Sequence, residues 1–70
     1  MKPTIRFQIG DRVRITRYFA GIAVGSTGTV IHIFITSRYC DVRFDGFHQP
    51  QLVSTLDLEL TQRQSAPPVS

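Results

Sequence analysis

The sequence predicts a small all-β domain, a five-stranded antiparallel barrel with one short helical turn before its last strand. Two observations support this prediction. Apolar residues recur with a period close to two in several segments, whereas a helical period is scarce. Five such segments, each short and bounded by turn-forming residues, follow one another within about fifty residues of the chain. Closing the strands into a barrel would remove the exposed edges that promote aggregation.

The first predicted strand runs from Arg12 to Thr16, where Val13 and Ile15 alternate with polar residues. It follows the pair Gly10-Asp11, which is typical of a turn. Residues 17–24 lack a clean period and contain a glycine, so we expect a loop there.

Residues 25–28 contain two glycines and predict a tight turn, in which both glycines supply backbone angles that other residues rarely adopt. Thr29 to Ile35 should then form a long strand, because this segment is rich in β-branched residues. Both faces of this strand are apolar, so it must be either central in the sheet or strongly bent. Coiling around a small barrel would achieve the second arrangement.

Three further strands are expected over residues 39–44, 51–53 and 58–60. Asp45-Gly46 is a strong hairpin signal after the first of them. Pro50 suits the start of the second, where a missing N–H is tolerated. Residues 54–57 should form a single helical turn, with Ser54 as its cap.

These elements predict one domain with two extensions. We expect an N-terminal arm over residues 1–9, a barrel over residues 10–60 and a disordered tail over residues 61–70. A chain of 70 residues makes a single domain. A domain of this size buries only roughly 60% of its unfolded surface, so its core is thin.

The predicted core follows from the apolar alternation. Where the long strand bends decides which side chains of residues 30–34 face inward, and the sequence does not place that bend. The core is expected to contain Val13, Ile15, Val30, Ile31, Ile33, Phe34, Cys40, Val42, Phe44, Leu52, Val53, Leu56, Leu58 and Leu60.

The sequence also predicts a cytoplasmic location. No continuous apolar stretch of the kind found in secretory signals follows the N-terminus. The longest apolar run, residues 30–35, is far shorter than the ~20 residues that span a bilayer. The lone Cys40 is consistent with a reducing compartment.

No pattern typical of catalysis or metal binding stands out. Cys40 is in phase with core positions, so we expect an inert buried thiol. His32 is expected to be partly buried and His48 to lie in a loop, and the close pairs typical of zinc ligands are missing. Residues 25–28 lack the Gly-Lys-Ser/Thr ending of a phosphate-binding loop. We therefore expect no enzyme activity, no cofactor and no bound metal.

Four motifs follow one another along the chain: Gly10-Asp11-x-Val13-x-Ile15, Gly25-x-x-Gly28-x-Val30, Val42-x-Phe44-Asp45-Gly46 and Leu58-x-Leu60. Together they resemble an SH3-like barrel. The second resembles the KOW motif of ribosomal proteins and transcription elongation factors. The whole pattern is similar to the E-type accessory proteins of photosystem I and to other small SH3-like domains of bacteria. These resemblances imply a five-stranded SH3-like barrel with either an accessory role or a nucleic-acid-binding role.

The net charge of +3 is unevenly distributed along the chain. Residues 1–38 carry six cations and one acid, a net charge of +5, whereas residues 39–70 carry two cations and four acids, a net charge of −2. Two arginines share one face of the first predicted strand, and a third precedes two aromatic residues in the loop. Because guanidinium groups pair with carboxylates or phosphates and stack on rings, this arrangement predicts a basic patch with an aromatic edge.

We expect a small non-catalytic adaptor that docks an acidic protein surface through this patch, since arginine and aromatic residues are favoured at interface centres. Two alternatives remain open. One is a KOW-like module that binds RNA or DNA through phosphate contacts and an aromatic stack. The other is a structural homo-oligomer that pairs through an edge strand or through residues 22–24. The residues expected to bind are Arg12, Arg14, Arg17, Tyr18 and Phe19, supplemented by Arg38 and Tyr39.

Overall fold

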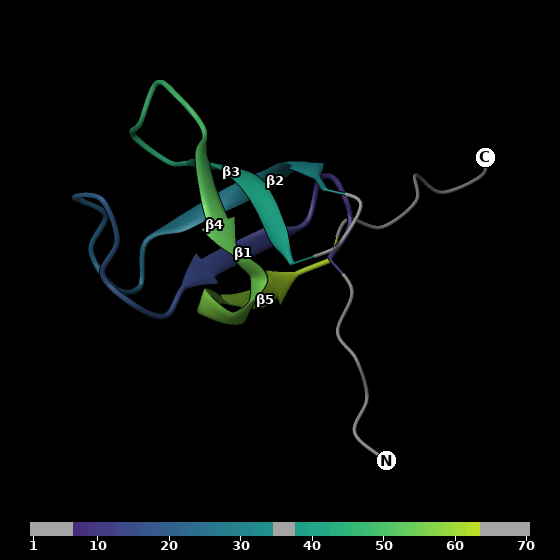
Figure 1. The fold of residues 1–70 in the computed structure, drawn as a ribbon, viewed down its shortest axis with the longest axis horizontal. Coiled ribbons are helices and arrows are strands. Elements are labelled where there is room, and N and C mark those ends of the chain that lie inside the picture. Colours follow the sequence, from purple (N-terminus) through teal and green to yellow (C-terminus); the bar gives the residue numbers. More distant parts are fainter. Residues whose placement is uncertain (1–6, 35–37, 64–70) are drawn as a thin grey trace, which may run out of the picture.

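The computed structural model describes residues 7–34 and 38–63, and it confirms the all-β class (Figure 1). Five strands follow one another along the chain, and the fourth and fifth are separated by the three-residue 3₁₀ turn η1. Ser54 caps this turn as predicted, because its hydroxyl oxygen accepts a hydrogen bond from the Leu56 N–H. The elements are β1 (Arg12–Ile15), β2 (Thr27–Ile33), β3 (Tyr39–Phe44), β4 (Gln51–Ser54), η1 (Thr55–Asp57) and β5 (Leu58–Gln62).

The five strands form one antiparallel sheet in the order β4-β3-β2-β1-β5. The two edge strands, β4 and β5, are consecutive in sequence and are joined only by η1. A flat five-stranded sheet is roughly 19 Å wide, whereas three 3₁₀ residues advance only about 6 Å. The sheet must therefore curl strongly, and Figure 1 shows β4 crossing in front of β1. Among the described residues no ladder joins β4 to β5, so the curled sheet stays open between its edges.

A β-bulge in β2 resolves the question of which residues of the long strand face inward. The register between β2 and β3 shifts between Val30 and His32, and Ile31 is the extra residue. A bulge of this kind bends the strand and increases its twist. Consequently Val30 is fully buried and Ile33 packs against the core, while the Ile31 side chain stays 40% exposed.

The buried core lies on the inner face of the curled sheet. It confirms most of the predicted positions but not all of them. Leu52 is exposed because it lies opposite Asp41 on the outer face, and Leu56 is exposed in the middle of η1. Phe34, beyond the end of β2, is also exposed, and Leu60 is half-buried. The buried apolar residues are Val13, Ile15, Ile22, Val30, Cys40, Val42, Phe44, Val53 and Leu58.

A buried carboxylate ties the two ends of the described chain together. The Asp11 side chain is fully buried, accepts a hydrogen bond from the Gln8 N–H at 2.8 Å and pairs with Arg63 at 3.4 Å. A buried charge needs such partners, because desolvation without them is costly. β5 continues to Gln62, two residues beyond its predicted end, because Gln62 pairs with Arg12 of β1; the Thr61 hydroxyl also donates to the Arg12 carbonyl at 3.0 Å. Only residues 61–63 of the predicted tail fall within the described residues.

Gly28 has a different role from the one predicted. It lies inside β2, which begins at Thr27, and only Gly25 of this pair has a positive φ (91°). A Cβ atom at Gly28 would lie 2.7 Å from the Arg43 carbonyl oxygen and 2.9 Å from the Phe44 Cα. Glycine is therefore required here for the close approach of β2 and β3, and not for an unusual backbone angle.

We expect Gly28→Ala to lower the free energy of unfolding by about 3 kcal/mol, because rigid backbone must move to admit the new methyl group. Gly46→Ala is the matched control: its surroundings are open and only its positive φ of 88° is unfavourable, which costs about 1 kcal/mol. Urea denaturation of both variants measures the difference. Equal losses would contradict the role assigned to Gly28.

Candidate protein-docking face

The loop over residues 16–26 is held to the core by a residue that the sequence analysis missed. Ile22 is fully buried. It forms an isolated bridge with Phe19, with hydrogen bonds of 3.1 and 2.7 Å in the two directions. Between them Ala20 and Gly21 both have positive φ, 50° and 83°, as the two central residues of a type I′ turn require. Gly21 is the only local signal of this turn, because alanine at Ala20 rarely adopts a positive φ.

Because Ile22 anchors the loop, the aromatic residues before the turn are presented to solvent in a defined position. Tyr18 is 70% exposed and Phe19 is 40% exposed. The base of the loop is closed by hydrogen bonds between Ile15 and residues 25 and 26. A loop whose backbone is already ordered loses little conformational entropy on binding, which favours recognition.

The turn η1 brings the two predicted groups of binding residues together. On one side its Asp57 carbonyl accepts from the Thr16 N–H at 2.8 Å, and its carboxylate pairs with Arg17 at 3.5 Å. On the other side its Thr55 N–H donates to the Arg38 carbonyl at 2.9 Å. Arg17 and Arg38 thus both contact η1, although about twenty residues separate them in sequence.

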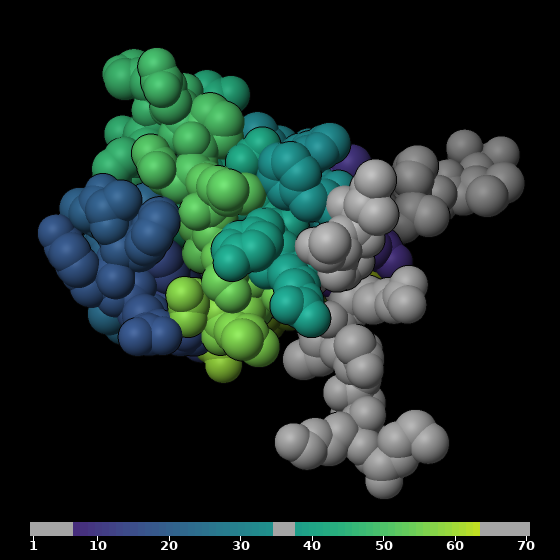
Figure 2. Space-filling view, in the orientation of Figure 1, coloured from purple at the N-terminus to yellow at the C-terminus, as the bar shows by residue number. Residues whose placement is uncertain are grey.

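Leu56, at the centre of η1, is 90% exposed, the highest value among the large apolar residues described. Tyr39, which lies opposite Ser54 in the β3–β4 ladder, is 48% exposed. Figure 2 shows the loop after β1, the start of β3, and β4 with η1 on one face of the molecule. We name this surface the docking face and define it by Arg17, Tyr18, Phe19, Arg38, Tyr39 and Leu56.

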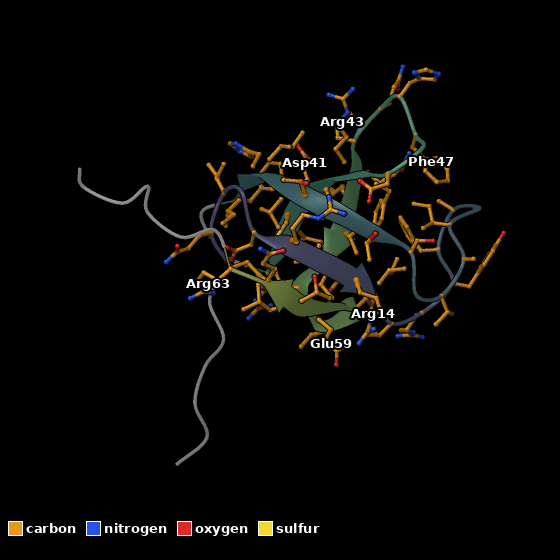
Figure 3. All side chains as sticks on the ribbon, turned by 180° about the vertical axis from the view of Figure 1, so that it is seen from behind. Arg14, Asp41, Arg43, Phe47, Glu59 and Arg63 are labelled. Atoms are coloured by element: carbon orange, nitrogen blue, oxygen red, sulfur yellow. The ribbon has the colours of Figure 1, made fainter. Side chains whose placement is uncertain are left out.

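Arg12 and Arg14, the other two predicted binding residues, are engaged within the protein. Both lie on the outer face of β1. The Arg12 guanidinium donates two hydrogen bonds to the Asp45 carboxylate, at 3.1 and 2.5 Å, and a third to the Thr29 hydroxyl at 2.8 Å. Arg14 pairs with Glu59 of β5, directly opposite in the ladder, and Figure 3 shows the two labelled side chains together.

The Arg12–Asp45 pair changes the protonation equilibria of both residues. The hydrogen bonds from Arg12, followed by the one from the Thr27 hydroxyl, hold the pKa of Asp45 below its ordinary value. The same contact raises the pKa of Arg12. Both groups therefore stay charged over a wider pH range than isolated side chains.

The uneven charge along the chain is balanced in space. Three arginines of the first half pair with carboxylates of the second half, at Asp45, Asp57 and Glu59, and Arg63 of the second half pairs with Asp11. The described residues contain six arginines and five carboxylates, since Lys2 and Arg6 lie outside them. The folded body is therefore close to neutral.

The cysteine and the two histidines considered for catalysis lie in different parts of the fold. Cys40 is fully buried on the inner face, as predicted, and burial raises the pKa of its thiol, with the Asp41 charge adding to the effect. His32 was expected to be partly buried, but it is exposed, because beyond the bulge it lies opposite Asp41 on the outer face. Its ring meets Phe34 edge-on, with the ring centroids 4.7 Å apart, and His48 is exposed in the β3–β4 connection as predicted. Within residues 7–34 and 38–63, no three histidine, cysteine or acidic side chains gather as metal ligands would.

Comparison with protein-family models, with curated proteins and with solved structures finds no match to this chain. In the part of the chain that the structure describes, no helix is long and apolar enough to cross a membrane.

The hairpin tip supports a prediction about backbone strain. Gly21→Ala should lower the free energy of unfolding by about 1 kcal/mol, because the space around Gly21 is open and only its φ disfavours a side chain. Ala20→Gly should raise it by roughly 0.5 kcal/mol, because the relief at φ 50° exceeds the entropy that glycine adds to the unfolded chain. Thermal and urea denaturation measure both variants. Changes of the same sign would contradict the type I′ turn.

The Arg12–Asp45 pair supports a prediction about pH. A carboxylate whose folded pKa is lowered stabilises the protein above its unfolded pKa, about 3.9, and this stabilisation is lost as the pH falls through the folded value. Arg12→Gln should return the pKa of Asp45 toward its ordinary value and weaken the acid dependence of stability. Arg14→Gln is the control, since Arg14 pairs with Glu59. NMR titration of the Asp45 carboxyl carbon distinguishes the two, and an unshifted pKa in the Arg12 variant would refute the assignment.

Proposed function

We propose that this chain is a small non-catalytic adaptor that docks an acidic protein surface through the docking face. The observation that carries the proposal is the exposure of Tyr18 and Leu56, 70% and 90%, on two segments that are each held in place by main-chain hydrogen bonds. Large apolar side chains grouped on an otherwise polar surface typically mark an interaction site. Tyrosine in particular is enriched among residues that dominate binding energy.

Charge supports an acidic partner. Arg17 and Arg38 flank the apolar centre of the docking face and both are exposed. The Arg17 pair with Asp57 is long, at 3.5 Å, and the Arg17 side chain is 74% exposed, so a partner carboxylate can compete for this guanidinium. Arginine at the edge of an interface would steer association and select the partner.

The strand order and the short connection between β4 and β5 support the SH3-like barrel that the motifs resemble. A KOW-like role in binding RNA or DNA has less support. Four of the six described arginines pair with the protein's own carboxylates. Binding to a polyanion depends on several cations that are available for phosphates.

The test is affinity capture from a lysate of the source organism with the immobilised full chain, comparing three proteins. The wild type should retain a partner that Tyr18→Ser/Leu56→Ser loses, with affinity reduced by about thirtyfold or more. The control is Ile9→Ser, which removes an apolar side chain that is 62% exposed in the turn before β1. The loop over residues 16–26 follows β1 and Ile9 precedes it, so Ile9 lies at the other end of that strand.

Two results separate the proposal from its alternatives. Retention of the same partner by the double variant, or its loss with Ile9→Ser, would contradict the docking face. A partner held through acidic groups should also associate more slowly as salt rises. Binding of the wild type to a labelled oligonucleotide at ~50 mM salt would instead favour the nucleic-acid alternative.

A further inference from the structure

A second feature lies outside the docking face. A shallow depression of about 360 Å³ borders the connection between β3 and β4. Its lining comes from β2 (Thr29), from β3 (Arg43) and from the connection itself, which supplies Asp45, Phe47 and His48. Figure 3 shows Arg43 and Phe47 at the end of the molecule that carries this connection, away from Arg14 and Glu59. The volume is near the lower limit for small-molecule sites, roughly 300 Å³.

The depression contains one arginine and one carboxylate, and only the carboxylate has a partner of opposite charge among the described residues. Asp45 already accepts two hydrogen bonds from Arg12 and one, at 3.0 Å, from the Thr27 hydroxyl. Its charge is therefore balanced by Arg12. Arg43, by contrast, has no ion-pair or hydrogen-bond partner among the residues that the structure describes. The depression thus presents one guanidinium that pairs with no carboxylate among the described residues; Asp41, two residues away on the same face of β3, lies outside the lining.

A hydroxyl donor lies beside that guanidinium. Thr29 and Arg43 are directly opposite in the β2–β3 ladder, so their side chains share the outer face. The Thr29 oxygen accepts from Arg12 at 2.8 Å, which leaves its own O–H proton able to donate to a ligand. A guanidinium and a hydroxyl side by side suit an oxyanion, because the planar fork of arginine holds two oxygens at once.

The rest of the depression suits a flat organic group. The Phe47 ring is 39% exposed and His48 follows it in the connection. Aromatic rings bind the faces of nucleobases by stacking. A single arginine fits a single phosphate better than a long phosphodiester chain, whose binding grows with the number of neutralised phosphates.

We propose that this depression binds a nucleoside monophosphate, with the phosphate on Arg43 and Thr29 and the base against Phe47. The ligand class is a phosphate monoester that carries a planar base. The proposed site binds the nucleotide non-covalently and catalyses no reaction of it. It is independent of the docking face, and either assignment can fail without the other.

The experiment is an NMR titration of the isotope-labelled full chain with three probes: adenosine monophosphate, inorganic phosphate and adenosine. The nucleotide should shift the amide signals of Thr29, Arg43 and residues 46–48 and saturate with a Kd of about 1 mM, and each of the two fragments should bind at least about tenfold more weakly. Failure of the nucleotide to give saturable shifts at these residues by ~20 mM would overturn the proposal, as would equal affinity for phosphate alone.

Three variants assign the contacts, and their amide spectra report that each remains folded. Arg43→Gln should weaken nucleotide binding about tenfold or more, because it removes the charge from an exposed position. Phe47→Leu should reduce the advantage of the nucleotide over phosphate while leaving phosphate binding in place. Arg14→Gln, which removes an equal charge far from the depression, should leave the Kd unchanged. Unchanged nucleotide binding by Arg43→Gln would also overturn the site.

Discussion

The connection between the two edge strands is the constraint on which the rest of this structure depends. η1 spans three residues, yet β4 and β5 lie at opposite edges of a five-stranded sheet. The sheet can satisfy both facts only by curling, and the curl creates an inside where a small chain can bury a core. The same turn receives hydrogen bonds from the loop after β1 and donates one to the start of β3, so it also assembles the docking face.

The charged residues pair mainly with one another, whereas the linear charge pattern predicted a basic surface for a partner. The excess of cations in the first half and of acids in the second half could mark a surface that attracts other molecules. In the folded chain these opposite charges meet: Arg14 pairs with Glu59 on the neighbouring strand β5, and Arg12 reaches past β2 to Asp45, just after β3. Exposed pairs of this kind contribute little stability individually. Their consequence is a nearly neutral folded body, so the proposed recognition relies mainly on exposed aromatic and apolar groups.

Local patterns predicted the strands well because alternation, turn residues and caps act over only a few positions. They failed where a long-range contact decided the outcome. Ile22 lies in an aperiodic loop, and only its packing against the sheet shows that it belongs to the core. Ile31 lies in an apolar run, and only the bulge against β3 leaves it exposed. Leu56 is apolar in a short turn, and nothing packs over it because η1 lies at the surface.

The sequence by itself determined the all-β class, the five strands, the capped turn before the last one and most of the inward-facing residues. These follow from the two-residue period of strands and from the backbone preferences of glycine, proline and serine. Only the tertiary structure decided which charges neutralise one another and which apolar residues remain exposed. It also decided that loop, turn and strand meet on one face. Those outcomes depend on pairing between strands far apart in the chain, and a linear pattern of side chains does not specify that register.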